Sequence, residues 1–380
     1  MNGKPAMEND CVLAELKKGD LYEMTKPIHQ QATNVYQTKD GKWYHLHGSM
    51  NASATMGMVG VEEQDVTREE AIKIFGDKVA QYDAAYLEKT ANEELRQAGV
   101  TCLSPEEFFA SEHGKIMADE PLWTMTPVPA PQSTWPLQKS DKFKPLEGIR
   151  VIDFSRVIAA PVISKVLAVL GAEVIKVSSK NLPDVIVTWI DLSAGKKDAN
   201  IDLKSEEGKN AFRRLVAGAD VLIDGYRPSV LDKLGFNSES LRKINQKLVY
   251  VRENCYGFKG PLAYRSGWQQ ISDCLFNIWY YRLGQYTADQ CKALLARNEG
   301  FHVRHYNEMY SLIQKTHAAI CKVRPELLKN PDYFSVMTGR EWGVDDNISI
   351  LAPPFKLETS VLEYAVPSGA RGRSIPEWEA

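Results

Sequence analysis

The sequence lacks the features that mark several protein classes. Its six cysteines are scattered without a Cys-x-x-Cys pair or a histidine at metal-ligand spacing, so we expect reduced thiols, no disulfide or zinc framework and no bound metal. No apolar run approaches the roughly 18 residues that span a bilayer. The start, Met1–Lys4, leads into charged sequence and is not typical of a secretory signal. These absences predict a cytoplasmic chain without membrane contact.

An excess of positive charge is also missing. The 46 Lys and Arg residues stand against 49 Asp and Glu residues, for a net charge of −3, which leaves no global field to attract nucleic acid or an anionic membrane. A polyanionic ligand would therefore need a local basic patch. With 44% hydrophobic and 25% charged residues, the composition excludes disorder, collagen and coiled coil. The 380 residues suffice for two or three domains of roughly 100–200 residues each.

A proline-rich segment divides the chain. Residues 124–136 contain four prolines, which oppose helix and favour an extended, polyproline-like chain. We therefore interpret 124–144 as a linker. It joins a small domain at 1–123 to a large domain at 145–330, and 331–380 is expected to return to the fold as a C-terminal segment.

Short, mixed elements are expected in the small domain. Two β-rich runs over Asn34–His47, on either side of Asp40-Gly41, predict a hairpin. Helices are expected to begin at the capping box Thr67–Glu70 and at Ser104–Glu107. Another helix is expected over Ala84–Gln97, closed by Gly99. This mixture predicts a small α+β domain.

The large domain alternates strand and helix patterns. Strands are expected at 149–154, 173–177, 221–223 and 248–251, and helices at 161–170, 205–217 and 241–244. Such alternation is typical of βαβ units, which build a doubly wound parallel sheet with helices on both faces. The fold class predicted for the whole chain is therefore α/β.

Six short motifs of the large domain carry a family resemblance. They stand in order at Pro145–Pro161, Leu170–Val177, Ile201–Gly208, Ala219–Pro228, Leu231–Phe236 and Tyr256–Pro261. Together they resemble the family III CoA-transferases, also called the CaiB/BaiF family. The resemblance implies a Rossmann-like large domain that binds CoA, acyl-CoA as a substrate, and a homodimer, often with chains that interlock like links.

The first block resembles the small domain of the same family. The similar stretches are Tyr36–Gly48, Ala98–Cys102 and Ser111–His113. In the family's usual order the large domain comes first, whereas here the small-domain block precedes it. This arrangement, with the tail from Trp342 to Trp378, resembles a longer, fungal-type branch of the family without its front portion.

The resemblance also implies which residues hold CoA. Its phosphates need cations and backbone N–H groups, and its adenine needs an apolar or planar surface. The turn Val157–Ala160 lies between a strand end and a helix start, where doubly wound sheets bind ligands. Ordinary helix–sheet packing of this turn, and solvated surface charges for the lysines, stay open as alternatives. The residues expected to contact CoA are Val157, Ala159, Lys204, Tyr226, Arg227, Lys233 and Leu234.

The chain departs from the family where its transferases keep a nucleophile. Their Asp attacks the acyl-CoA carbonyl and forms a mixed anhydride, in a segment that should here follow Leu283-Gly284. The sequence continues instead with Gln285–Lys292, in which Asp289 has no glycine at the family's spacing. We expect the usual catalytic Asp segment to be missing.

A second departure supplies candidate catalytic residues. Trp268-Gln269 stands where the family's racemases have His-Asp and many transferases have Tyr and an acid. Gln269 can orient a carbonyl but is neither nucleophile nor base, and Asp273, one turn on, shares its helical face. His45 and His47 alternate along a strand, so both face one side as candidate acid–base groups. A surface role for Asp273 and exposed strand positions for the histidines are the alternatives.

Three functions fit this sequence. The first is a CoA-transferase-like enzyme that acts on an acyl-CoA or carbonyl-containing small molecule without the usual Asp anhydride. The second is a CoA-independent isomerase, lyase or cyclase of specialised metabolism, and the third is a non-catalytic pseudoenzyme subunit. Tight CoA binding would favour the first, and binding of an uncharged, polyketide-like ligand would favour the second.

Overall fold

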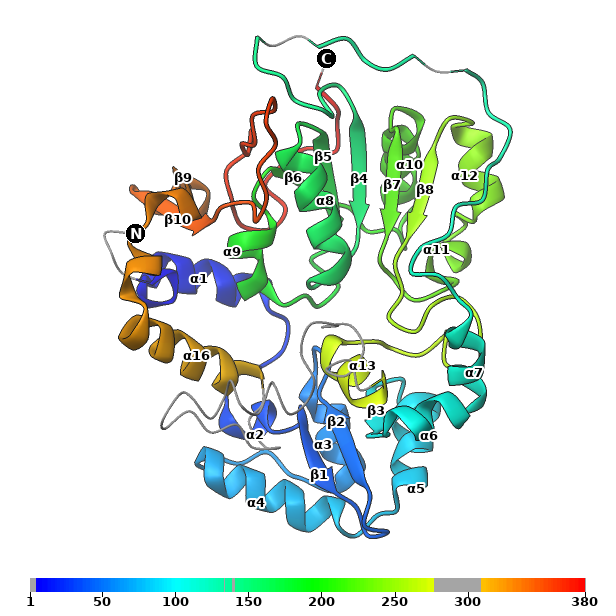
Figure 1. Cartoon of the computed structure of the whole chain (residues 1–380), viewed down its shortest axis with the longest axis vertical. Helices are drawn as coiled ribbons and strands as arrows, with labels where there is room; N and C mark the ends of the chain where they lie inside the picture. Colours follow the sequence, from blue (N-terminus) through cyan, green and yellow to red (C-terminus); the bar gives the residue numbers. More distant parts are fainter. Residues whose placement is uncertain (1–4, 133, 139–140, 277–308, 380) are drawn as a thin grey trace. The chain divides into compact units, whose positions relative to one another are not determined.

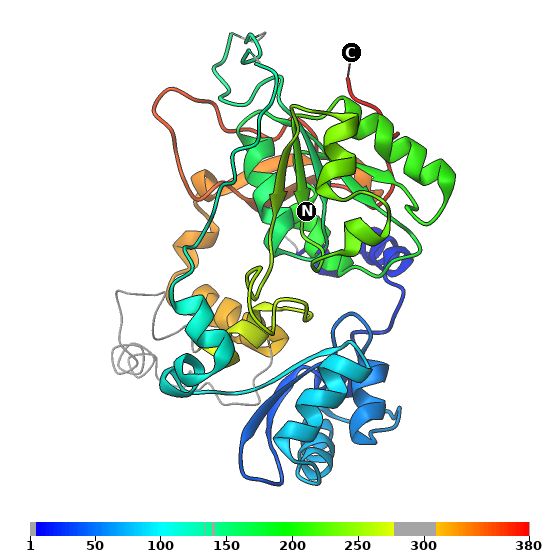
Figure 2. The same ribbon diagram turned by 90° about the vertical axis from the view of Figure 1, so that its right-hand side faces the viewer.

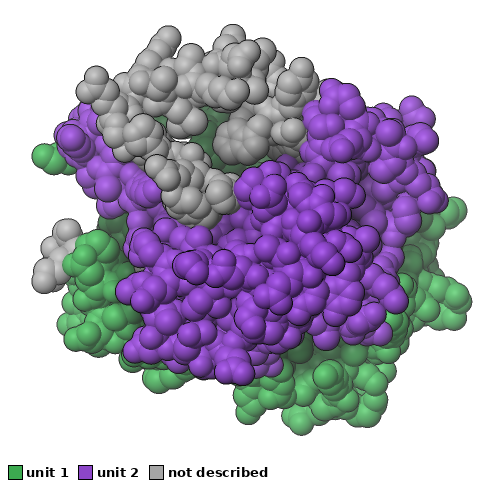
Figure 3. All heavy atoms as spheres, turned by 90° about the horizontal axis from the view of Figure 1, so that it is seen from below, with its two compact units in different colours: residues 1–21, 125–253, 329–380 green, residues 22–124, 254–328 purple. Residues whose placement is uncertain are grey.

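The computed structural model describes residues 5–132, 134–138, 141–276 and 309–379. The chain divides into two compact units, which Figure 3 shows in separate colours. We call residues 1–21, 125–253 and 329–380 the large unit. We call residues 22–124 and 254–328 the small unit.

Each unit combines segments that are distant in the sequence. Residues 1–21 join the large unit because helix α1 (Asp10–Gly19) is buried against the C-terminal segment. Residues 254–328 join the small unit because helix α13 (Gln269–Phe276) packs on strand β3 (Ala98–Thr101). The continuous ranges expected from the sequence differ from these units, since contacts between distant segments leave no mark in a one-dimensional pattern.

The large unit is built on a five-stranded parallel sheet (Figure 1). Its strands are β4 (Arg150–Phe154), β5 (Glu173–Ser178), β6 (Lys196–Asn200), β7 (Val221–Asp224) and β8 (Val249–Arg252). They stand in the order β6-β5-β4-β7-β8, and each neighbouring pair is parallel. The chain moves outward from β4 to β6 and then returns to the other side of β4. This order confirms the doubly wound, Rossmann-like sheet that the sequence predicts.

Helices cover both faces of this sheet (Figures 1 and 2). Ile152 of β4 lies in one buried cluster with residues of helix α10 (Glu206–Ala217). Its neighbour Val151 lies in a second cluster with residues of helix α8 (Ala159–Val169). Because successive strand residues point to opposite faces, the apolar run of β4 buries both sides of the sheet and fixes a three-layer α/β architecture.

The remaining elements of the large unit lie between or after these strands. They are α9 (Trp189–Leu192), α11 (Val230–Lys233), α12 (Ser238–Ile244), β9 (Phe334–Thr338) and β10 (Asn347–Leu351), and the last two pair antiparallel. Within the described ranges of the whole chain, no helix is long and apolar enough to cross a bilayer.

Strand β6 is the element of the sheet that the sequence did not predict. Its charged run does not have the pattern of a buried strand, yet Lys196 and Asp198 are only 1% and 2% exposed. The C-terminal segment bridges to this strand, with Ala199 opposite Ser374 in a parallel bridge. The strand is therefore covered by chain far away in sequence, which explains why charged residues on it are buried.

The small unit contains a three-stranded antiparallel sheet in the order β1-β2-β3. Strands β1 (Asn34–Gln37) and β2 (Trp43–His47) confirm the expected hairpin. The capping boxes at Thr67 and Ser104 are both formed, as expected. The helices of this unit are α2 (Pro27–Gln30), α3 (Ala52–Val59), α4 (Arg68–Val79), α5 (Ala84–Lys89), α6 (Pro105–Ala110), α7 (Glu112–Ala118), α13 and α16 (Met309–Val323).

One expected helix of the small unit is wrong in extent. The α-helix α5 ends at Lys89 and continues as a single π-helical turn over Thr90–Glu94, rather than reaching Gln97. Gly99 does not close a helix but lies in β3, where a Cβ atom would come 2.3 Å from the hydroxyl oxygen of Tyr44. Packing against Tyr44 therefore accounts for a glycine that resembles a helix end.

Candidate functional site

The turns after β4 and β7 meet where the strand order reverses. In doubly wound sheets this edge forms the crevice in which ligands bind. Gly225 begins the turn after β7, and a Cβ atom there would come 2.4 Å from the Cβ of Ala160 and 2.8 Å from the Cβ of Ser155. Only glycine permits so close an approach. The local sequence therefore brings the two turns together at the switch point of the sheet.

Val157, in the turn after β4, has an unusual backbone conformation. Its φ of 65° lies in the left-handed region, which β-branched residues rarely adopt. Its N–H donates to Oδ1 of Asp184 at 3.0 Å, and the Thr188 hydroxyl, which donates to the carbonyl of Val185 at 2.7 Å, lies 3.4 Å from the Val157 carbonyl oxygen. Polar contacts from the segment after β5 thus hold the residue in this conformation.

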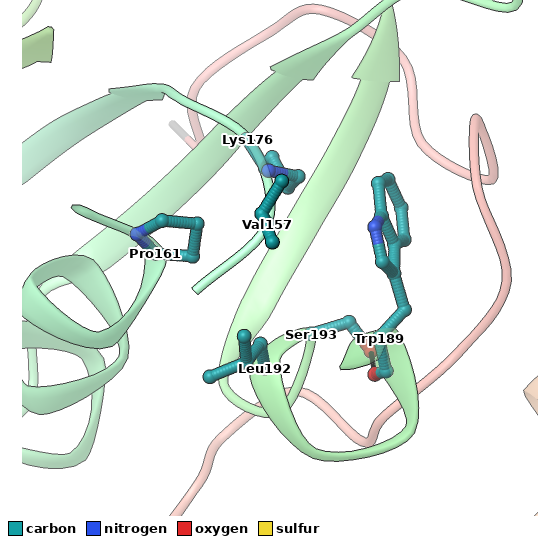
Figure 4. A pocket seen from close by; sticks show the side chains of 6 residues that line it. All are labelled: Val157, Pro161, Lys176, Trp189, Leu192 and Ser193. Atoms are coloured by element: carbon teal, nitrogen blue, oxygen red, sulfur yellow. Dashed lines mark hydrogen bonds between the residues drawn. The ribbon is translucent and has the colours of Figure 1, made fainter. Parts of the chain in front are cut away.

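A shallow depression with no room for a water molecule lies beside this turn, and Figure 4 shows the side chains that line it. The Lys176 ammonium lies 5.1 Å from the centre of the Trp189 ring and donates to the carbonyl of Ser155 at 2.8 Å. The depression thus has an aromatic and a cationic side. Its lining residues are Val157, Pro161, Lys176, Trp189, Leu192 and Ser193.

Three side chains form a stack across the two turns. The guanidinium carbon of Arg156 lies 4.8 Å from the centre of the Tyr226 ring, and the Tyr226 and Phe154 rings stack with centroids 4.3 Å apart. Arg156 also donates to the carbonyl of Pro183 at 3.0 Å. A guanidinium held over an aromatic ring offers a planar cation, which suits a planar ring or a phosphate.

A buried ion pair lies beneath these turns. The ammonium of Lys196 lies 2.9 Å from Asp153, which also accepts a hydrogen bond from Ser164 at 2.6 Å. Burial lowers the pKa of Lys196 to about 8. Burial alone would raise the pKa of the Asp153 carboxyl, but Lys196 and Lys176 hold it well below its ordinary value. Asp153 is therefore an anion that balances two buried lysines, not an acid.

The residues expected to contact CoA all follow the carboxyl ends of β4, β6 or β7. Because these strands are parallel, their ends lie at one edge of the sheet. Ala159, Lys204 and Lys233 are exposed there, whereas Val157, Tyr226 and Arg227 are half-buried. Leu234 packs against the cluster on the α10 side of the sheet. The full set is Val157, Ala159, Lys204, Tyr226, Arg227, Lys233 and Leu234.

Two histidines are buried in the small unit. His45 and His47 are 4% and 3% exposed, so neither is an exposed strand residue. Their rings stack with centroids 5.8 Å apart, which places them on one side of β2 as expected, and His47 also stacks on Trp268 at 4.5 Å. Trp268 therefore covers His47 at the start of α13.

Burial keeps both imidazoles neutral. Desolvation lowers the pKa of His45 to about 4, and desolvation and the neighbouring His45 lower the pKa of His47 well below its ordinary 6.5. The Nδ1 atom of His47 accepts the N–H of Ser49 at 2.9 Å, so the neutral ring carries its proton on Nε2. His47 is thus a hydrogen-bond donor rather than a base near neutral pH.

Gln269 and Asp273 lie on one face of α13, as expected. The Gln269 amide donates to Oδ1 of Asp273 at 2.7 Å. Burial raises the pKa of Asp273, and this hydrogen bond opposes the shift. The segment Gln285–Lys292, with Asp289, lies outside the described residues. Among the residues that are described, no group of three or more His, Cys, Asp or Glu side chains is placed to hold a metal ion.

Three residues at the sheet edge escaped the sequence reasoning. Arg156 is the second residue after β4, and a charged residue just after a parallel strand is a pattern that could have revealed it. Lys176 lies inside β5 and resembles an ordinary strand residue. Asp184 acts on Val157 across 27 positions of sequence, and no local pattern announces such a contact.

The fold defines a doubly wound α/β protein whose strand ends meet at the edge where such sheets bind ligands. The family model described as CoA-transferase family III matches residues 146–293. The chain is also 30% identical to the acetyl-coenzyme A transferase nodX of Hypoxylon pulicicidum over an alignment 423 positions long. This alignment covers 92% of this chain and 71% of that protein. The chain therefore belongs to the family III CoA-transferases.

Other relatives match shorter parts of the chain. An acyl-CoA transferase of Gibberella moniliformis is 34% identical over 264 residues, which cover 65% of this chain and 45% of that protein. Among solved structures, that of Rv3272 from M. tuberculosis is 19% identical with a TM-score of 0.44 and covers 61% of this chain and 98% of its own. A CAIB/BAIF family protein from Brucella suis is 28% identical with a TM-score of 0.36, over 49% of this chain and 51% of its own.

Proposed function

We propose that the chain binds an acyl-CoA at the carboxyl edge of its parallel sheet and transfers the acyl or CoA group. One observation carries the proposal: the Val157 turn and the Arg156–Tyr226 stack meet at the switch point of the sheet. The names of its relatives, an acetyl-coenzyme A transferase and an acyl-CoA transferase, support the substrate class.

The chemistry of CoA matches the side chains at this edge. The adenine needs a flat surface, and the Arg156 guanidinium on the Tyr226 ring supplies one. The phosphates need cations, and Arg227 follows Tyr226 directly, while Lys204 and Lys233 are exposed at the same edge. An overall net charge of −3 does not oppose this binding, because phosphate recognition here depends on local cations.

The acyl-transfer step is proposed to depart from the usual Asp anhydride. Its support is the sequence, from which we expect the family's usual Asp segment to be missing. In the small unit, His47 carries its ring proton on Nε2, and a neutral N–H can donate to a substrate oxygen as negative charge develops on it. Within the small unit, His47 would thus stabilise an oxyanion, with burial keeping its ring neutral and His45, Gln269 and Asp273 as candidate partners.

A CoA-independent isomerase, lyase or cyclase is the second candidate. The observation that favours it is the Trp268 ring stacked on His47, since an aromatic wall beside an N–H donor suits an uncharged carbonyl compound. This candidate makes no use of the cations at the sheet edge. The two functions are therefore separated by which ligand binds.

Calorimetric titration with CoA and acetyl-CoA tests the first function. We expect Arg227→Ala to weaken CoA binding at least about tenfold, because a charge-assisted hydrogen bond to phosphate contributes about 1.5–3 kcal/mol. Arg156→Ala should weaken it as well, through loss of the stacked cation. Repeating the titration with 3′-dephospho-CoA shows which phosphate each residue contacts. A variant that lacks only the 3′-phosphate contact should bind this ligand with the same affinity as the wild type.

A matched control removes another cation of the large unit. Lys243 on α12 is exposed and pairs with Glu239 at 2.7 Å, so Lys243→Ala should bind CoA as the wild type does. Equal CoA affinity in wild type and Arg227→Ala would remove Arg227 from the site. Absence of CoA binding by the wild type, with binding of an uncharged polyketide-like ligand, would replace the first function by the second.

We also propose that the chain forms a homodimer, with a second copy covering its linker. Large apolar side chains stand exposed along this segment, with Met125 76%, Trp135 63% and Leu137 88% exposed. Such a row of exposed apolar residues is unusual on a monomer. Light scattering should give twice the chain mass of 42.7 kDa for the wild type and a lower mass for Trp135→Ser/Leu137→Ser, and a wild-type monomer would contradict the proposal.

A further inference from the structure

Val157 is the strained position of the proposed CoA edge. Its left-handed φ of 65° costs free energy because its branched Cβ crowds the backbone in that region. A residue keeps such a conformation only where the surrounding structure enforces it. Val157 stands between the end of β4 and the start of α8, so its conformation sets the direction in which the turn meets a ligand.

The enforcing group is the carboxylate of Asp184. Its Oδ1 accepts the N–H of Val157 at 3.0 Å and the N–H of Val185 at 2.8 Å, and its Oδ2 accepts the indole N–H of Trp189 at 3.2 Å. Asp184 is 2% exposed, so these three donors, rather than water, satisfy a buried carboxylate. A buried hydrogen bond to an ionised acceptor is among the stronger restraints available to a turn.

The residue before Asp184 holds the other half of the same turn. The carbonyl of Pro183 accepts a hydrogen bond from Arg156 at 3.0 Å, and Arg156 is the residue stacked on Tyr226. The Thr188 hydroxyl in turn reaches the Val157 carbonyl at 3.4 Å. The segment 183–188 therefore restrains both Arg156 and Val157, although it follows a different strand.

We propose that Asp184 is a positioning residue for CoA binding, which acts by holding Val157 in its left-handed conformation. The inference rests on the proposed function, since it assigns a role within that CoA edge. The alternative is that Asp184 merely anchors the Trp189 indole and stabilises the large unit. Glycine at position 157 distinguishes the two, because glycine adopts positive φ without steric cost and does not need the carboxylate.

A cycle of four proteins tests this role: the wild type, Asp184→Ala, Val157→Gly and the double variant, each titrated with CoA by calorimetry. Asp184→Ala should lower CoA affinity about tenfold or more in the Val157 background, as loss of a charge-assisted restraint predicts. In the Val157→Gly background the same substitution should cost about threefold or less. An equal loss in both backgrounds, or no loss in either, overturns the proposal.

Hydrogen exchange supplies a readout that does not need CoA. The Val157 amide should exchange faster in Asp184→Ala than in the wild type, and should stay protected in Trp189→Phe, which keeps the ring but removes the indole donor. If the Val157 amide lost protection in both variants, Asp184 would act by anchoring the Trp189 indole instead. Asp191→Ala is the matched control for affinity, because Asp191 lies nearby in α9, is half-exposed and pairs with Lys165, and it should bind CoA as the wild type does.

Together, the CoA titrations and the hydrogen-exchange measurement distinguish a failure of this inference from a failure of the proposed function. If the wild type binds no CoA, the proposed function fails and the CoA role of Asp184 fails with it, whatever the exchange result. If the wild type binds CoA but Asp184→Ala neither weakens binding nor exposes the Val157 amide, the CoA edge stands and the positioning role alone is refuted.

Discussion

The ammonium of Lys196 lies 2.9 Å from a carboxylate oxygen of Asp153, and both side chains are at most 1% exposed. Lys196 also donates to the carbonyl of Pro161 at 2.7 Å. Removing one partner of such a pair leaves the other charge buried without compensation, which costs about 3–5 kcal/mol. We therefore expect Lys196→Met to lower the free energy of unfolding by this amount in urea denaturation.

Substitution of the neighbouring Lys197 provides a matched control. Lys197 pairs with Glu173 at 2.7 Å, but both side chains retain about a fifth of their exposure, so Lys197→Met should cost about 1 kcal/mol or less. If the two variants were equally stable, the Asp153–Lys196 pair would not support the turns above it.

The contribution of the Asp198 carboxyl to folding stability should change with pH in the opposite direction from that of most carboxyl groups. Its Oδ1 accepts the Ser178 hydroxyl at 2.8 Å and the N–H of Gly372, and burial raises its pKa to about 6. The folded state therefore holds the proton more tightly than the unfolded state, whose pKa is about 3.8. By linkage, this group's stabilising contribution is present below pH 4 and is lost as the pH rises through 6.

Asp198→Asn removes this dependence because it keeps an oxygen acceptor without a titratable charge. The difference between the thermal unfolding midpoint of the variant and that of the wild type should shift in favour of the variant, toward a higher temperature, from pH 5 to pH 8. Asp202→Asn is the control, since Asp202 is only half-buried and its pKa is lowered by hydrogen bonds from Lys204 and Asn181. An Asp198→Asn advantage that is equal at both pH values would show that Asp198 does not titrate near 6.

Much of the fold could be predicted from the sequence because its patterns are local. The parallel strands β4, β5, β7 and β8 and the helices between them follow apolar runs and capping residues. Strand β6 escaped, because Lys196 and Asp198 are buried only through partners elsewhere in the fold. Helix α5 was predicted too long because Gly99, which makes room for the Tyr44 hydroxyl, resembles a helix end in the sequence.

The candidate site was predictable only in part. The turn at Val157 could be located, because a strand end followed by a helix start is a sequence pattern. The Asp184 contact could not, because a carboxylate that reaches across 27 residues has no periodicity. For His45 and His47, the shared side of the strand was predictable, but burial and the stack with Trp268 depend on α13, more than two hundred residues away.

The buried histidines should show their neutrality directly. Since desolvation lowers the pKa of His45 to about 4 and that of His47 well below 6.5, neither ring signal should titrate between pH 6 and 8 in NMR. The stabilising contribution of these neutral rings is present above the ordinary pKa and is lost as the pH falls from 6.5 toward 4.

Single substitutions assign the two signals and test the role. His47→Ala should abolish turnover with the small unit still folded, whereas His45→Phe should reduce the acid sensitivity of unfolding because it keeps a ring without a proton site. A midpoint near 6.5 for His47 would restore it as a general base and contradict its assignment as a donor.

From the sequence we expect the family's usual Asp segment to be missing, and this expectation predicts that acyl transfer does not pass through an Asp anhydride. In the usual route an Asp carboxylate attacks the thioester, CoA thiolate leaves, and the mixed anhydride formed is converted by hydroxylamine into an Asp hydroxamate. Asp273, on α13, accepts a hydrogen bond from the Gln269 amide at 2.7 Å, which occupies one carboxylate oxygen and reduces its ability to attack a thioester. We therefore expect mass spectrometry to find no hydroxamate after incubation with acetyl-CoA and hydroxylamine, as in a control without acetyl-CoA. A hydroxamate at Asp273 or Asp289 would show that the nucleophile has moved along the chain rather than been lost, and its removal by the corresponding Asp→Asn variant would locate it.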